Sequence, residues 1–293
     1  MLKLVPKLAR QLIRMIALTA LAGLACALLV RFAPGANIDD RELDLRLSEQ
    51  TRSALRAENE ARNHLSSALL GYFRGLAHGD LGYSHSRNAP IADLISDAAP
   101  ETLRELSAGL ALSWLAALAM AIPSGRSFPA RGWTAASSAF TGLLLSLPAA
   151  LLAYLCLSAG AKTELVFALA LMPKIYPVSK NLLAEARAAS FVDAARAWGL
   201  SESRILWLHV LPAAAPQMIA LAATTVALAA GAAIPIETIC DVPGLGRLAW
   251  QAATARDLPL LINLTMLVAL ATTAAVAVAE LATAWSETEA VMA

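Results

Sequence analysis

The chain has 293 residues, of which 58% are hydrophobic and only 15% are charged, and its mean hydropathy is +0.60. A soluble domain averages about 45–50% apolar and about 25% charged residues, so the composition excludes an ordinary soluble protein and indicates a membrane protein. The net charge is +1, without a basic patch interleaved with aromatic residues, so we expect no nucleic-acid partner. The three cysteines lack metal-ligand spacing, and we expect no metal site.

Apolar runs of about 20 residues, the length that crosses a bilayer as a helix, recur along the chain. They predict an all-α integral membrane protein with six transmembrane helices, at 15–33, 103–122, 139–159, 163–187, 214–236 and 260–283. The first run follows a basic segment, as a secretory signal does, but no A-x-A cleavage site follows it, which favours an uncleaved span. Pro148 predicts a kink in the third span.

Lys and Arg near the ends of short loops predict the orientation. The N-terminal segment 1–14 is basic, and both this segment and the tail 284–293 are predicted to be cytoplasmic, as is the segment 188–212. The segments 34–102 and 237–259 are then extracytoplasmic. In the longer one, apolar residues recur at helical spacing and predict a helix on the membrane or against the bundle; they are Leu65, Leu69, Phe73 and Leu76.

The cytoplasmic segment between the fourth and fifth spans is charged and regularly built. Residues 181–198 contain no Pro or Gly and many helix formers, which predicts a helix that continues from the fourth span without interruption. Gly199 is placed to end that helix, and Ser201 to cap a short second one. That second helix is too apolar to remain in water, so either its own bundle or a partner protein must cover it.

Here the chain resembles a known family. The pattern D-A-A-x3-G-x9-H-x-L-P, from Asp193 to Pro212, is similar to the EAA motif of bacterial ABC importer permeases, E-A-A-x3-G-x9-I-x-L-P. Asp193 stands for Glu and His209 for Ile. The stretches GDLGYS (79–84), APIADLISDAAPETL (89–103) and ETICDVPGLGRLAWQAATARDLPLL (237–261) resemble the B-type permease subunit of the dipeptide, oligopeptide and nickel importers.

The resemblance implies a type I ABC importer permease fold with a cytoplasmic coupling helix, in the bacterial inner (plasma) membrane. This subunit would form half of the translocation pathway. Its implied partners are a second permease subunit, two cytoplasmic ATPases and an extracytoplasmic solute-binding protein. The residues that it places against the ATPase are Asp193, Ala194, Ala195, Arg196, Gly199, Leu200, Ser201, Glu202, Arg204, Ile205, Leu206, Leu208, His209 and Pro212.

The chain contains no G-x-x-x-x-G-K-[ST] phosphate loop. We therefore expect no catalytic residue and no bound cofactor, with ATP and Mg²⁺ held by the partner ATPases. Three residues are candidates for the translocation path: Lys174 and Tyr176 in the proline-interrupted fourth span, and Arg247 in the PGLGRL turn. Two of them also have a plain alternative, a snorkelling lysine for Lys174 and a structural turn for Arg247.

Two other functions remain open from the sequence. The chain could be an ATPase-independent carrier or channel, with Lys174 or Glu280 as its charged element. It could also be a divergent permease relative that serves as a structural subunit, because its connection SAGAKTE is short and its tail lacks the family's Asp-Pro-Arg ending. Peptides are the favoured transported substrate, and nickel chelates, glutathione-like compounds and short oligosaccharides are the alternatives.

Overall fold

The computed structural model describes residues 4–32, 75, 79–84, 86–124 and 128–292. The helix predicted around Leu65–Leu76 lies outside this part of the chain. The predicted all-α fold is confirmed for the described residues, where the sole sheet is the two-stranded antiparallel hairpin of β1 and β2, which pairs Tyr83 with Pro90.

The described elements follow one another along the chain as α1 (Leu4–Phe32), β1 (Tyr83–Ser84), β2 (Ala89–Pro90), α4 (Ile91–Ala121), α5 (Phe128–Ser146), α6 (Ala149–Ser158), α7 (Thr163–Arg187), α8 (Ser190–Ala197), α9 (Glu202–Ile205), the π-helix η1 (Leu206–Val210), α10 (Leu211–Ile239), α11 (Leu245–Thr254) and α12 (Leu258–Met292). The tail predicted at 284–293 is therefore mostly a continuation of α12.

Within the described residues, four helical segments are long and apolar enough to cross a membrane: Arg10–Leu29, Ile91–Ala121, Glu202–Ile239 and Leu258–Thr283. A fifth is the bent pair Gly132–Ser146 and Ala149–Ser158. The helix α7 does not belong to this set; it contains Lys174, Lys180 and two internal prolines. A multi-pass membrane protein is confirmed, and a count of six spans is not.

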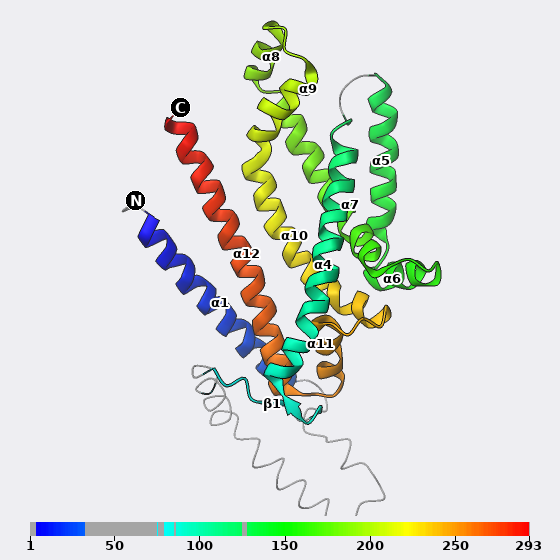
Figure 1. Ribbon diagram of the computed structural model, residues 1–293, viewed down its shortest axis with the longest axis vertical. Helices are drawn as coiled ribbons and strands as arrows, with labels where there is room; N and C mark the ends of the chain where they lie inside the picture. The colour runs from blue at the N-terminus through cyan, green and yellow to red at the C-terminus, as the bar shows by residue number, and fades with distance from the viewer. Residues whose placement is uncertain (1–3, 33–74, 76–78, 85, 125–127, 293) are drawn as a thin grey trace, which may run out of the picture.

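The helices form a bundle in which both chain ends and the α8–α9 elbow lie at one end (Figure 1). The hairpin and α11 lie at the opposite end (Figure 1). The helix α7 is at the centre, because it packs on α4, α5, α6 and α10, while α1 packs on α12. The largest buried cluster includes Leu171, Ile175, Tyr176 and Leu183 of α7.

The kink predicted at Pro148 is a break. The helices α5 and α6 meet at 102°, so α6 lies across the bundle rather than extending α5 (Figure 1). Pro148 has no amide hydrogen to continue the helix, and its ring disfavours helical geometry at Leu147. Pro148 instead occupies the N-cap position of α6. The predicted third span, 139–159, thus joins parts of two separate helices.

The helix α4 is longer than the predicted second span, since it begins at Ile91 rather than at residue 103. Its contact with α7 depends on Gly109, where an added Cβ would collide with the Cβ of Phe167 and come within 3.3 Å of the Glu164 carbonyl oxygen. Phe167 is fully buried. Gly109 therefore allows the two helix backbones to approach closely.

We expect Gly109→Ala to destabilise the protein by about 1–3 kcal/mol, because the new methyl group overpacks the α4–α7 contact. The melting temperature of the detergent-solubilised protein should fall by several degrees. Gly142→Ala in α5 is the matched control, because its added Cβ meets nothing within 4 Å. It should raise stability by up to about 1 kcal/mol, since Ala is the better helix former. Equal shifts in both variants would contradict the packing argument.

Candidate functional site

The elbow between α7 and α10 is the candidate partner-binding site. The helix α8 ends at a Schellman motif in which the Gly199 amide donates to the Arg196 carbonyl (2.9 Å) and the Leu200 amide to the Ala195 carbonyl (3.2 Å). Gly199 has φ +77°, a conformation that glycine adopts without steric cost. The turn predicted at Gly199 is confirmed.

The uninterrupted helix predicted over 181–198 is wrong. The helix α7 ends at Arg187, and α8 begins at Ser190 after an extended Ala189 with ψ 144°. The Arg187 guanidinium donates to the carbonyls of Ile122 (2.7 Å) and Ser124 (2.9 Å) at the end of α4. These bonds anchor the end of α7 to α4, and the break lets α8 turn Val192 and Ala195 into the core.

An ion-pair clasp joins the two halves of the elbow. Arg196 in α8 donates to the carboxylate of Asp193 (3.1 Å) and, across the glycine turn, to that of Glu202 in α9 (2.9 Å). The hydrogen bond that Arg196 donates to the Glu202 carboxylate is the largest cause that raises the pKa of Arg196. The polar residues that the sequence assigned to a partner thus first hold the elbow itself in shape.

The short second helix is continuous with the membrane helix that follows it. After α9 the chain makes the π-helical turn η1 and proceeds into α10, so Glu202–Ile239 is one helical run. A π-turn adds a residue to the helical repeat and often lies at functional sites. Pro212 does not interrupt this helical run, because proline is tolerated in the first turn of α10.

The apolar residues of this segment divide between the core and the surface. Ile205 and Leu206, predicted to contact the ATPase, are buried in the chain's own core, which corrects that prediction. The exposed side chains are Trp207 and Leu208, with 65% and 58% of their surface accessible. Trp198, at the end of α8, is 84% exposed. The sequence prediction omitted both tryptophans, although large aromatic side chains in a charged loop are a signal for an interface.

The remaining predicted elbow residues are found as follows. Ser201 occupies the N-cap position of α9, but its hydroxyl makes no capping hydrogen bond, contrary to prediction. Ala195 is buried, and Leu200 and His209 are half-buried. The exposed members of the predicted set are Asp193, Ala194, Arg196, Gly199, Ser201, Glu202, Arg204, Leu208 and Pro212.

The three candidates for the translocation path are not brought together. Tyr176 is fully buried, and its hydroxyl lies 2.6 Å from the Ser137 hydroxyl in α5 and 3.4 Å from that of Ser124. Lys174 is half-buried in the middle of α7, with no hydrogen bond or ion pair to the described residues. Arg247 lies in α11 and pairs with Asp241 (2.8 Å).

A buried carboxylate organises the end of the bundle opposite the elbow. Glu237 accepts hydrogen bonds from the amides of Gly246 (2.7 Å) and Arg247 (3.2 Å) and from the Thr102 hydroxyl (2.8 Å). It thereby stabilises the first turn of α11 and joins it to α4. An added Cβ at Gly246 would lie 2.7 Å from the Ala233 carbonyl oxygen, so the PGLG turn requires glycine for close packing.

A second carboxylate fastens the hairpin to α12. Asp257 accepts hydrogen bonds from the hydroxyls of Ser84 (2.6 Å) and Ser86 (2.7 Å) and from the Ser86 amide (2.9 Å). Burial opposes ionisation of Asp257, but these bonds outweigh it and hold the pKa of the carboxyl below its ordinary 3.8. The hairpin, α11 and the start of α12 therefore form one cap on this end of the bundle.

Comparison with known proteins identifies the family. Residues 109–289 match the model of the binding-protein-dependent transport system inner membrane component, which is more than half of the chain. The chain belongs to this family. The oligopeptide transport system permease protein of Salmonella typhimurium is 26% identical over 239 residues, 72% of this chain and 77% of that protein. A protein of Brucella ovis named as a peptide permease is 28% identical over 274 residues, 82% of this chain and 84% of that protein.

Membership in the family confirms the resemblance to ABC importer permeases that the sequence motifs indicated. The chain is a multi-pass inner membrane component of a transport system, and its role is that of a translocation-pathway subunit. The family region begins at residue 109, within α4, and ends within α12. It contains the elbow, its anchor Arg187 and the carboxylates Glu237 and Asp257, whereas the hairpin and Thr102, which bond these carboxylates, precede the matched region.

The acid stability of the cap tests the role of Asp257. A carboxyl with a lowered folded-state pKa stabilises the protein above its unfolded-state pKa, and this contribution is lost as the pH falls through the folded-state value. Asp257→Asn should therefore reduce the melting temperature at pH 7, and the difference from the unmodified protein should disappear as the pH falls below about 3.8. A difference that stays constant at acid pH would contradict the bonding described for the ionised carboxylate. Asp241→Asn is the control: this exposed carboxyl pairs with Arg247 at the surface, where an ion pair contributes about 0–1 kcal/mol, so the melting temperature should change little.

Proposed function

We propose that this chain is the permease subunit of an ATP-driven importer of peptides or related small solutes, coupled to a separate ATPase through its elbow. The observation that carries the proposal is the surface of the elbow. This chain, a member of the permease family, exposes Trp198, Trp207 and Leu208 on a segment whose other face is buried in the core. Large aromatic side chains surrounded by charges are typical of interface centres. If the elbow projects into the cytoplasm, its exposed aromatic side chains do not contact lipid, and a partner protein must cover them.

The proposed orientation places both chain ends and the elbow in the cytoplasm. The positive-inside rule counts Lys and Arg near the ends of short loops. It supports this orientation, because the segment 1–14 carries four such residues and the elbow carries Arg196 and Arg204, and both lie at the same end of the bundle (Figure 1). The hairpin and α11 would then face outward and receive the solute-binding protein. A second permease would complete the pathway, and ATP and Mg²⁺ would be bound by two partner ATPases.

The contacts of α7 support a coupling route from the elbow to the bundle. Arg187 ties the end of α7 to α4, and the Tyr176 hydroxyl ties α7 to α5. Lys180 adds a hydrogen bond of 3.4 Å to Ser138 in α5. A displacement of the elbow would therefore move α4, α5 and α7 together, and ATP binding to the partner would shift the bundle only through differential affinity for its two states.

The cargo proposal rests on the relatives and on Lys174. The relatives are named for oligopeptide and peptide transport. A half-buried ammonium at membrane depth is costly unless it faces a cavity or a partner, and we propose that Lys174 meets the carboxylate of a passing peptide. The buried Tyr176 and the paired Arg247 have structural partners in the described conformation and are weaker candidates for the path.

Association with an ATPase tests the central proposal. We expect Trp207→Glu to reduce the amount of ATP-hydrolysing subunit that copurifies with the full-length tagged chain by about tenfold or more, because buried interface tryptophans commonly dominate binding. Trp250→Glu is the matched control: the residue is 51% exposed on α11, at the other end of the bundle. It should leave copurification unchanged. Equal recovery with both variants would contradict docking through the elbow, and the absence of any copurifying ATPase with the unmodified chain would favour the ATPase-independent carrier.

Coupling is tested separately from association. Arg187→Met removes the donors to the Ile122 and Ser124 carbonyls and should lower transport several-fold while leaving the ATPase bound, because the elbow's surface is intact. Arg187→Lys retains one cation with hydrogen-bond donors and should recover part of the transport. Uptake by vesicles containing the complete transporter measures the first effect, and copurification the second. Loss of ATPase binding in Arg187→Met would assign this residue to the shape of the elbow instead.

A further inference from the structure

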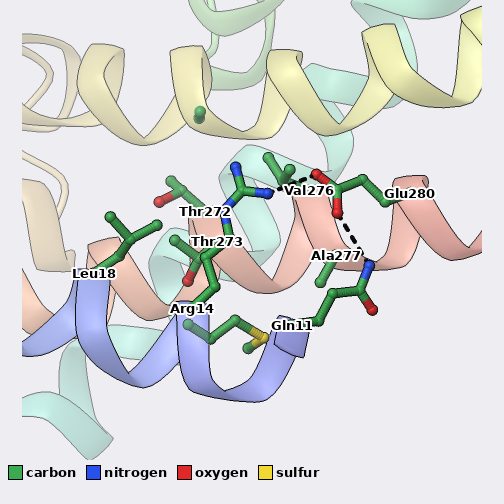
Figure 2. A pocket seen from close by; sticks show the side chains of 10 residues that line it. Gln11, Arg14, Leu18, Thr272, Thr273, Val276, Ala277 and Glu280 are labelled. Atoms are coloured by element: carbon green, nitrogen blue, oxygen red, sulfur yellow. Dashed lines mark hydrogen bonds and ion pairs between the residues drawn. The ribbon is translucent and has the colours of Figure 1, made fainter. Parts of the chain in front are cut away.

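A pocket of about 290 Å³ opens between α1, α12 and α10, away from the elbow and the cap. Its lining combines a polar end and an apolar wall. Figure 2 shows Gln11 and Arg14 of α1 at the polar end, facing Glu280 of α12, with the hydroxyl-bearing Thr272 and Thr273 beside them. Met15, Leu18, Ala227 and Val276 supply apolar surface.

The polar end contains one cation and one anion. The Arg14 guanidinium donates to one Glu280 oxygen at 3.0 Å, and the Gln11 side-chain amide donates to the other at 3.1 Å. Both charged side chains remain accessible, 58% for Arg14 and 44% for Glu280. Arg14 has no other hydrogen bond or ion pair to the described residues, so the rest of its donor fork is available to a ligand.

The depth of the pair places it at a membrane boundary. Arg14 lies four residues after the start of the span Arg10–Leu29, and Glu280 lies three residues before the end of the span Leu258–Thr283. At 1.5 Å per residue, both are about 4–6 Å inside the ends of their spans. This is the level at which charged side chains reach phospholipid headgroups, and the apolar wall continues towards the hydrocarbon.

We propose that this pocket binds the headgroup of a phospholipid that contains a primary ammonium group, such as phosphatidylethanolamine. The phosphate would bind the free side of the Arg14 guanidinium, and the ammonium would donate to the Glu280 carboxylate. The Arg14–Glu280 pair has no net charge, so a purely anionic headgroup would be attracted by Arg14 but repelled by Glu280. A choline headgroup has no N–H to donate.

The same chemistry disfavours a helix of the second permease as the occupant. Arg14 can bind an anion and Glu280 can bind a cation, a few ångströms apart. A single side chain inserted by a partner helix would supply only one of these charges. A zwitterionic headgroup supplies both within one small group. The position of the pair at the span ends, with the pocket open beside it, also matches a lipid held in the leaflet rather than a protein core.

Native mass spectrometry of the purified full-length chain tests the proposal. The chain is mixed with phosphatidylethanolamine, phosphatidylcholine or phosphatidylglycerol that carry identical acyl chains. We expect the ethanolamine lipid to bind about tenfold more tightly than the choline lipid, because charge-assisted hydrogen bonds are lost with choline. We expect the ethanolamine lipid also to bind more tightly than phosphatidylglycerol. Arg14→Gln and Glu280→Gln should each reduce the preference to about twofold or less.

Arg10→Gln is the control, since it removes an exposed cation one helical turn from Arg14 that does not line the pocket; the preference should persist. The comparison of lipids on the unmodified chain stands even if a pocket variant does not fold. Equal binding of the three lipids would overturn the proposal. So would equally tight displacement by soluble glycerophosphoethanolamine, which would indicate a site for a soluble phosphodiester. Variants that weaken association with a second permease, without changing lipid preference, would assign the pocket to a protein interface.

Discussion

The close packing of α7 on α4 is the contact on which the rest of the bundle depends. Gly109 removes the side chain that would separate the two helices, and Phe167 fills the space beside it. At the other end of the contact, Arg187 donates to the carbonyl of Ile122, the C-cap of α4, and to that of Ser124 just beyond it. The two helices are thus fixed along their length and at their tip, and α5, α6 and α10 pack around α7.

The elbow and the core are parts of one packed unit. Val192, Ile205 and Leu206 face inward and belong to the same buried cluster as Leu171 and Ile175 of α7. The exposed aromatic side chains are therefore carried on a rigid support rather than on a loose loop. Rigid support is a requirement for transmitting displacement, since a flexible segment would absorb the movement of a partner.

Patterns within one segment were predictable from the sequence, and contacts between distant segments were not. Apolar runs predicted the long helices, and Gly199 predicted the turn. Leu206 and Leu208 have the same side chain, but Leu206 is buried and Leu208 is exposed, because the helical turn η1 points them in different directions. The partners Ser84 and Asp257 are 173 positions apart, and no local periodicity signals such a pair. The buried Tyr176 hydroxyl likewise finds its partners far away in the sequence, in Ser137 of α5 and in Ser124 of the turn after α4.

The helical run from Glu202 to Ile239 contains 38 residues, about 57 Å at 1.5 Å per residue. Trp207 is near one end of this helical run, and Glu237, which organises the cap opposite the elbow, is near the other. Events on opposite sides of the bilayer therefore share a single piece of secondary structure, with no intervening joint apart from the π-turn and the internal prolines. A displacement at the cap and a displacement at the elbow can therefore be coupled mechanically by the tilt of one helix.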